Sequence, residues 1–195
     1  MVCWNNKFKE FKLLANTHNN QRARKTKQVI ASKFIELLQT KPVNKITVTE
    51  LTSLCRINRG TFYQYYRDPY DLLEKLCHNL IIELTEAIKF NQRDLDIPMH
   101  LMCMLKVIQK HRTIAKVCLA NLQSDKEFYM AFNEIKQVSF ALFKKDNPLL
   151  NDFECELQYT FFTQGSLALI LEWLNKPNNL SIDDVAQLLT RLYVK

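Results

Sequence analysis

The sequence predicts an all-α protein, and three observations point to this fold class. The 195 residues include only two glycines and five prolines, whereas an all-β chain of this length needs many glycine-containing tight turns. Apolar residues recur at helical spacing through most of the chain. Ser, Thr, Asn or Asp stands in front of several of these stretches, as expected for helix N-caps. The shortage of glycine also excludes glycine-rich phosphate loops and dinucleotide-binding fingerprints.

The first helical stretches lie in the N-terminal third. Residues 1–21 are predicted to be an extension, because the polar segment 16–20 interrupts a short apolar periodicity. The next helix carries Ile30, Phe34 and Leu37 on one face and ends before Lys41-Pro42. Thr47-Val48-Thr49-Glu50 then has the spacing of a capping box, in which the side chains of the first and fourth residues bond to each other's amides.

Two short helices and a long one follow this box. The first short helix ends at Cys55, and Asn58 is a good N-cap for the second, which is predicted to run from Arg59 to about Tyr65. Asp68-Pro69 supplies an N-cap and an N1 proline for a long leucine-rich helix.

The rest of the chain is predicted to contain only helices, for a total of nine or ten. One begins near Pro98, and Ser124-Asp125-Lys126-Glu127 is a capping box for another. A long helix is expected from about Asn151 to Leu174, and Ser181 caps the last one.

Composition limits the classes of function. The chain carries a net charge of +7, and all of the excess lies before Leu76, where 14 basic residues face 6 acidic ones. Such a basic segment is typical of a surface that meets a polyanion, although a merely solvated basic face is an equally good interpretation of charge alone. No apolar run is long enough to cross a membrane, and no secretory signal is visible at Met1.

The cysteine and histidine pattern predicts neither a metal site nor an enzyme. The six cysteines form no CxxC pair and have no histidine at ligand spacing, so we expect free thiols that pack as small apolar side chains in a cytoplasmic protein. Cys77-His78 is expected to belong to the core. No motif of a hydrolase or metalloprotease occurs, and no cofactor is predicted.

Two short helices joined by a tight turn, inside the basic segment, have the form of a helix-turn-helix. The segment Thr47-x-x-x-Leu51-x-x-x-Cys55-x-Ile57-Asn58-Arg59-Gly60-Thr61-Phe62-Tyr63, followed by Tyr65-Tyr66-x-Asp68, resembles the DNA-binding signature of TetR-type (TetR/AcrR) transcriptional regulators. The resemblance covers roughly residues 24–76. A looser resemblance involves Phe161-Phe162-x-x-Gly165-Ser166 and Trp173-Leu174.

The resemblance implies a division of labour along the chain. Residues 22–68 are expected to form the DNA-binding domain, and residues 69–195 a helical regulatory and dimerisation domain. Phe62 and Tyr66 are expected to be core residues, whereas short or planar polar groups contact base edges and flanking groups contact phosphates. The candidate DNA-contacting residues are Arg24, Lys25, Lys27, Thr47, Thr49, Arg56, Asn58, Arg59, Gly60, Thr61, Tyr63, Gln64 and Tyr65.

The sequence departs from the family pattern at two notable positions. Arg56 stands where the family has glycine, at a turn position that is expected to have a positive φ. Pro69 replaces a common lysine and removes one phosphate contact.

The resemblance also implies a homodimer built from the last two helices of each chain. Both helices carry apolar residues at helical spacing, beyond what one packing partner needs. The predicted interface residues are Leu157, Phe161, Gln164, Gly165, Ala168, Val185, Leu188, Leu189 and Leu192.

The sequence therefore predicts a sequence-specific, homodimeric DNA-binding regulator of a palindromic operator, most often a repressor in this family, that responds to a small apolar effector. The alternatives are a ligand-activated or co-activator member of the same family, a DNA-organising protein without an inducer, and a helical protein-interaction dimer without DNA binding. The effector is not identified by the sequence. The stretch Met99, Met102, Cys103 and Met104 fits an adaptable pocket or plain core equally well, whereas Phe140, Phe143, Phe161 and Phe162 are expected to be packing residues.

Overall fold

The computed structural model describes residues 18–90, 97–121, 126–176 and 180–193, and within these ranges every regular element is a helix. The predicted all-α fold is confirmed. The chain divides into two compact units, the first extending to Leu72 and the second beginning at Leu73. The predicted capping box at 124–127 lies partly outside the described residues.

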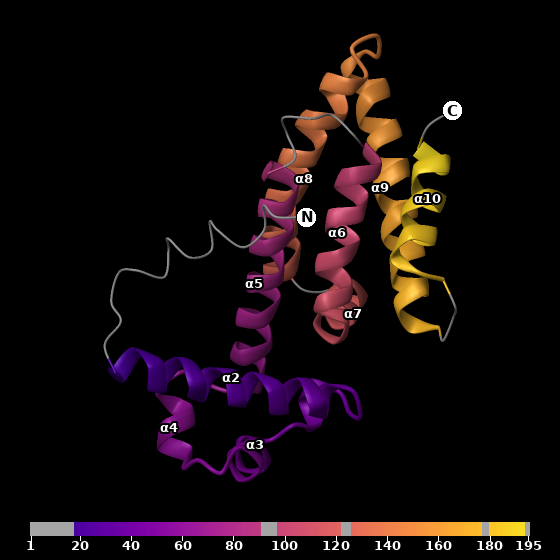
Figure 1. Ribbon diagram of the computed structural model, residues 1–195. Coiled ribbons are helices and arrows are strands. Elements are labelled where there is room, and N and C mark those ends of the chain that lie inside the picture. Colours follow the sequence, from indigo (N-terminus) through magenta and orange to yellow (C-terminus); the bar gives the residue numbers. More distant parts are fainter. Residues whose placement is uncertain (1–17, 91–96, 122–125, 177–179, 194–195) are drawn as a thin grey trace. The chain divides into compact units, whose positions relative to one another are not determined.

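The first unit contains α2 (His18–Leu38), a 3₁₀ turn (Val43–Lys45), α3 (Val48–Cys55) and α4 (Arg59–Tyr63) (Figure 1). Helix α2 starts at His18, inside the predicted 1–21 extension. The side chains of Ile30 and Phe34 from α2, Leu51 from α3 and Phe62 from α4 are almost fully buried. These four side chains hold the three helices together.

The long helix α5 (Pro69–Phe90) begins with the predicted cap. The Asp68 carboxylate accepts a hydrogen bond from the Asp71 amide at 2.9 Å, and Pro69 occupies the first helical position. The buried Asp71 carboxylate in turn accepts a hydrogen bond from the Arg67 amide at 2.9 Å. These two side-chain caps fix the start of the helix without a glycine.

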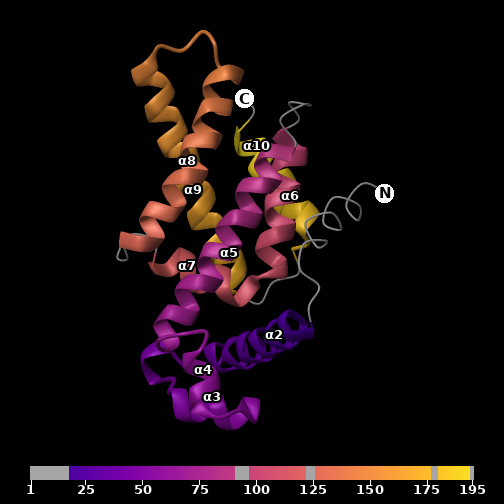
Figure 2. The ribbon, with the colours of Figure 1, turned by 90° about the vertical axis from the view of Figure 1, so that its left-hand side faces the viewer.

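The second unit continues α5 and adds α6 (Ile97–Lys110), α7 (Arg112–Asn121), α8 (Lys126–Asp146), α9 (Asp152–Asn175) and α10 (Ile182–Tyr193). Helices α8 and α9 form an antiparallel pair joined by a short turn, and α10 packs against α6 (Figures 1 and 2). Asn151 begins α9 with a capping box to Glu154, and Ser181 and Asp184 do the same for α10.

Polar contacts at partly buried and exposed positions connect helices of the second unit. Arg112 at the start of α7 donates to the main-chain oxygens of Trp173 and Leu174, and its guanidinium lies over the Trp173 ring. Glu83 of α5 accepts hydrogen bonds from Lys110 and His111. Partial burial raises the pKa of Glu83, but these hydrogen bonds outweigh it and leave the pKa below its usual value.

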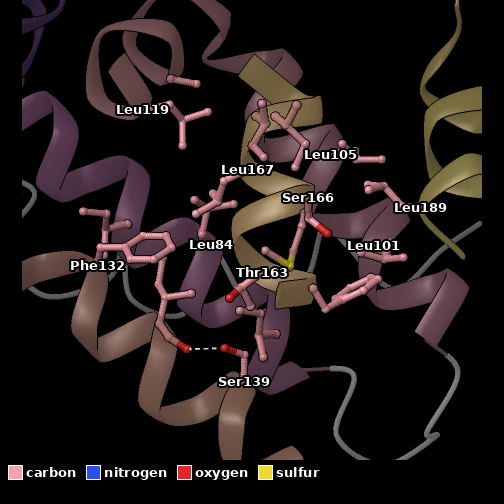
Figure 3. A pocket seen from close by; sticks show the side chains of 18 of the residues that line it. Leu84, Leu101, Leu105, Leu119, Phe132, Ser139, Thr163, Ser166, Leu167 and Leu189 are labelled. Carbon is pink, nitrogen blue, oxygen red and sulfur yellow. Dashed lines mark hydrogen bonds between the residues drawn. The ribbon is translucent and has the colours of Figure 1, made fainter. Parts of the chain in front are cut away.

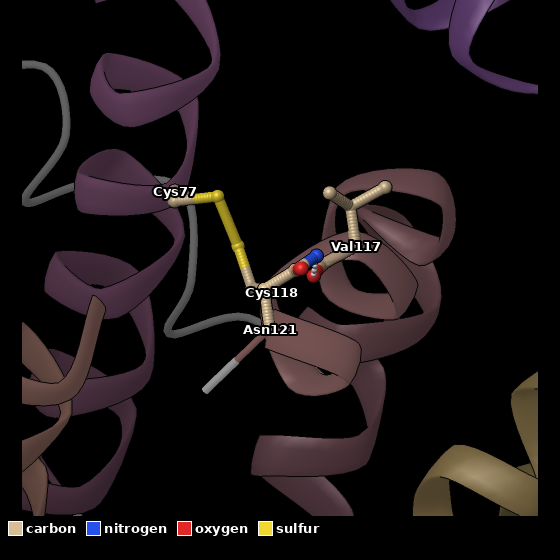
Figure 4. Close-up of a disulfide and its surroundings, with 4 residues drawn as sticks. All are labelled: Cys77, Val117, Cys118 and Asn121. Carbon is tan, nitrogen blue, oxygen red and sulfur yellow. Dashed lines mark hydrogen bonds between the residues drawn. A yellow bond between two sulfur atoms is a disulfide. The ribbon is translucent and has the colours of Figure 1, made fainter. Parts of the chain in front are cut away.

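A disulfide joins Cys77 of α5 to Cys118 of α7, over a sequence separation of 41 residues (Figure 4). The expectation that these two cysteines are free thiols is therefore wrong. Helical periodicity predicted correctly that both side chains are buried, but it carries no information on which buried sulfur atoms of different helices meet. Cys55, Cys103 and Cys155 are free, as expected.

We predict that reduction of this disulfide lowers the free energy of unfolding by about 2–4 kcal/mol, because the bond restricts the unfolded chain over a long loop. Urea unfolding with and without a phosphine reductant measures the difference. The Cys118→Ala variant is the control, since it cannot form the bond and its stability should not respond to the reductant. An equal response of both proteins would contradict the prediction.

Candidate nucleic-acid interface and internal pocket

Arg56 makes the turn between α3 and α4. Its backbone lies in the left-handed region, with φ 54° and ψ 45°, as the sequence predicted for this position. The amide of Ile57 donates to the Thr52 carbonyl at 3.0 Å, which closes the end of α3. The turn places α4 directly after α3 in a helix-turn-helix.

The start of α3 differs from the predicted capping box in one half. The Thr47 hydroxyl accepts a hydrogen bond from the Glu50 amide at 3.2 Å, as predicted. The Glu50 carboxylate, however, bonds to the Lys41 ammonium at 2.6 Å instead of bonding back to Thr47. The reciprocal half of the prediction is wrong because a charged donor is a stronger partner for a carboxylate than a main-chain amide.

Several of the polar residues predicted to contact DNA bond to one another in this structure. The Asn58 side-chain oxygen accepts from both the amide and the hydroxyl of Thr61, at 2.7 and 2.9 Å. The Arg59 guanidinium donates to the Thr49 hydroxyl. Asn58 is thus the N-cap of α4, as predicted, and Arg59 ties α4 to α3.

The outer face of α4 is formed by Gly60, Tyr63 and Gln64, which are all exposed. A Cβ at position 60 would lie 3.3 Å from the Asn58 side-chain oxygen that caps the helix, so a side chain here would crowd the cap. Phe62 and Tyr66 are buried behind this face, which confirms their predicted place in the core.

Basic residues line the exposed part of α2 in the same unit. Arg24, Lys25 and Lys27 are exposed, and the Lys27 ammonium lies 5.3 Å from the centre of the half-buried Tyr65 ring. This cation–π contact orients Lys27 and leaves its charge at the surface.

An internal pocket lies within the second unit and was not located by the sequence (Figure 3). It has a volume of about 220 Å³ and is lined by side chains from all six helices of this unit, most of them Leu, Ile and Phe. Of the methionine stretch, Met104 lines the pocket, whereas Met99 is largely exposed. Phe143 and Phe162 also line the pocket, whereas Phe140 packs edge-on against the Tyr159 ring.

Four hydroxyl groups interrupt the apolar wall. The Tyr159 and Ser139 hydroxyls bond to each other at 2.5 Å, and the Thr163 hydroxyl donates to the Tyr159 carbonyl at 2.8 Å. Burial raises the pKa of Tyr159, although the bond to Ser139 opposes the shift, so the phenol is neutral. Among the described residues, the Ser166 hydroxyl is the one buried side-chain polar atom without a hydrogen-bond partner.

The outward face of α9 is apolar and exposed. Phe161 is 82% exposed and Leu157 55%, and Gln164, Gly165 and Ala168 share their side of the helix. On α10, Leu188 and Leu192 are exposed, whereas Val185 and Leu189 are buried within the chain. The last two were predicted to face a partner subunit, and this assignment needs correction because their side chains pack into the core of their own chain.

Two further features bear on function. None of the helices in the described ranges is long and apolar enough to cross a membrane. In the same ranges, no three His, Cys, Asp or Glu side chains gather as they would around a metal ion.

Comparisons with known proteins agree with this geometry. No known family model matches the sequence. A curated protein from Lactococcus lactis, the HTH-type dhaKLM operon transcriptional activator DhaS, is 32% identical over 59 residues, which are 30% of this chain and 32% of that protein. The chain therefore matches about a third of the length of this relative.

Solved structures extend the similarity to most of the chain. A TetR transcriptional regulator from Streptococcus agalactiae is 22% identical with a TM-score of 0.63, covering 91% of this chain and 98% of its own. Thermus thermophilus FadR, a TetR-family repressor in complex with lauroyl-CoA, is 17% identical with a TM-score of 0.56, covering 86% of this chain and 92% of its own. These similarities confirm that the chain has the fold that the sequence resemblance implied.

We predict that Arg56→Gly stabilises the protein by about 1 kcal/mol relative to Arg56→Ala, because glycine adopts the left-handed conformation without the Cβ penalty. Both variants lose the same charge, so any common loss of affinity for a polyanion reports the guanidinium and not the turn. Urea unfolding of the two variants measures the difference. Equal stabilities would show that the turn does not impose the left-handed conformation.

Proposed function

We propose that this chain, which has the fold of the TetR-family transcriptional regulators, is a sequence-specific DNA-binding regulator that acts as a homodimer. The observation that carries the proposal is that the basic face of α2 and the exposed face of α4 belong to one compact unit built around a helix-turn-helix. A polyanion with a groove that admits a helix is the partner that fits both features.

In this proposal α4 enters the major groove. Gln64 can reach bases directly, whereas Arg59 and Thr61 do so after exchanging the internal hydrogen bonds described above. Asn58 and Gly60 allow the close approach of the helix. Phosphates are contacted by the groups around it: Thr47, Thr49, Arg56, Tyr63, Tyr65, Arg24, Lys25 and Lys27.

The homodimer is supported by the outward face of α9. An aromatic side chain that is 82% exposed in the middle of a helix, with apolar and small neighbours on the same side, is costly in water and suits an interface. The seam that we propose consists of Leu157, Phe161, Gln164, Gly165, Ala168, Leu188 and Leu192. A two-fold axis through it supplies two recognition helices, which a palindromic operator with half-sites about 34–36 Å apart requires.

The pocket is the proposed effector site, and repression is the mode that we favour. A ligand that prefers one of two dimer geometries shifts the population between them and so changes operator affinity. Activation is the second candidate, because the Lactococcus relative is named an operon activator. A reporter gene with the selected operator placed upstream of, or overlapping, its promoter distinguishes the two modes.

The DNA-binding proposal is tested by neutralising Arg24, Lys25 and Lys27 together with glutamine. We predict a uniform loss of affinity across DNA sequences and a salt dependence that is shallower by about one for each lost phosphate contact. Fluorescence anisotropy with labelled duplexes at several salt concentrations measures both.

The matched control replaces Lys89, Lys106 and Lys136 of the second unit by glutamine, which changes the net charge equally. This variant should keep the slope of the unmodified protein. Equal slopes for both triple variants would mean that net charge, and not the face of α2, attracts the DNA. A failure of the unmodified protein to bind any DNA at low salt would favour the protein-interaction alternative.

For the dimer, we predict that Phe161→Glu yields a helical monomer that no longer binds the operator, because two buried like charges would face each other across the two-fold axis. Leu149→Glu is the control, since Leu149 is 98% exposed in the turn before α9 and lies outside the proposed seam. Light scattering gives the mass and circular dichroism the helix content. An unmodified protein that is monomeric at micromolar concentration would refute the seam.

A further inference from the structure

We propose that the internal pocket selects a small uncharged amphiphile, an apolar body with a single hydroxyl or carbonyl group, and that the Ser166 hydroxyl is its hydrogen-bond partner. This inference rests on the proposed effector role of the pocket and names the chemical class that fills it. It is supported by the size of the pocket, by one unpaired polar atom and by the charges of its wall.

The size and walls of the pocket define the apolar body. A volume of about 220 Å³ lies just below the range of roughly 300–1,000 Å³ that is typical of drug-sized ligands. Leu84 of α5, Leu105 of α6 and Ile135 of α8 are among the lining side chains, and all three are buried. The gain in free energy on binding therefore comes mainly from apolar surface removed from water.

The polar end of the ligand is indicated by Ser166. Serine and threonine hydroxyls within helices commonly donate to the carbonyl four residues before them, and Thr163, Ser139 and Thr85 do so here. The Ser166 hydroxyl does not, although its oxygen is buried. A buried hydroxyl without a partner destabilises the protein. A ligand oxygen that bonds to Ser166 therefore contributes more binding free energy than the same oxygen would contribute elsewhere in the wall.

The other three hydroxyl groups of the pocket already have hydrogen-bond partners within the protein. Ser139 and Tyr159 bond to each other, and Thr163 bonds to its own helix. In Figure 3 the Ser166 side chain projects from α9 on the side where Leu101 and Leu189 lie, away from Ser139. A ligand therefore needs only one polar group, at the Ser166 end.

The charges of the wall exclude anions. None of the described lining residues is Lys, Arg or His, and the charged residue among them is Asp146, the last residue of α8. Burial raises the pKa of Tyr159, so this phenol does not supply a charge at neutral pH. A carboxylate in this wall would lose its hydration without gaining a cation. Asp146 is only partly buried and lies at the end of α8, so we do not expect it to require a cationic ligand.

The test is isothermal titration of the full chain, in the absence of DNA, with three ligands that share an eight-carbon tail: 1-octanol, octanoate and octyltrimethylammonium. We expect 1-octanol to bind at least ten times more tightly than either ion. Ser166→Ala should lower the affinity for 1-octanol about two- to twelve-fold, which is the usual effect of losing one hydrogen bond. The same variant should melt at a higher temperature than the unmodified protein without ligand, because it removes an unsatisfied buried hydroxyl.

Thr85→Val is the matched control, because it also removes a buried helical hydroxyl of the second unit, but one that is already bonded and does not line the pocket. It should leave the affinity for 1-octanol within two-fold and should not raise the melting temperature. Tighter binding of either ion, or an unchanged affinity in Ser166→Ala, would overturn the proposal. These outcomes do not depend on DNA binding, so the proposed regulator function is tested separately by the operator titrations above.

Discussion

The structure depends on one constraint, which is that the chain changes direction almost without glycine. Neither Gly60 nor Gly165 has a positive φ, and both lie inside helices. In the described residues, Arg56 is the one position with a left-handed backbone. Side-chain caps begin several of the helices, for example Asp68 for α5 and Asn151 for α9. Polar side chains are therefore used first to build the fold.

If the chain binds DNA as proposed, this use of polar groups reduces the number of side chains that are available to contact bases. Asn58 is occupied as a cap, and the Arg59 guanidinium is bonded to Thr49. A base that bonds to Arg59 must replace the bond to Thr49. The net free energy gained from the new bond is therefore smaller, and so is its contribution to distinguishing one base from another. Because no such exchange is needed at Gln64, we infer that it contributes more to specificity than its place at the end of α4 suggests.

Local features of the fold were predictable from sequence, whereas pairings between distant residues were not. The caps at Thr47, Asn58 and Asp68 depend on residues three apart, and the sequence identified them. The Cys77–Cys118 bond depends on how two helices are packed, which periodicity does not encode. The same reason explains why the pocket was missed: its lining comes from six helices, and Ser166 is distinguished only by the partner that it lacks.

Helix α9 presents the pocket and the proposed seam on opposite sides. Tyr159, Thr163, Ser166 and Ile170 line the pocket at spacings of four, three and four residues, which is one face of a helix. Leu157, Phe161, Gln164 and Ala168 repeat the same spacing half a turn away and are exposed. A ligand that shifts α9 therefore moves the seam as a rigid element, without a separate relay. Close packing of the core makes such a shift a choice between discrete arrangements. The extent to which a ligand changes the population of these arrangements is then limited by the difference in its affinity for them, and not by how tightly it binds to either one.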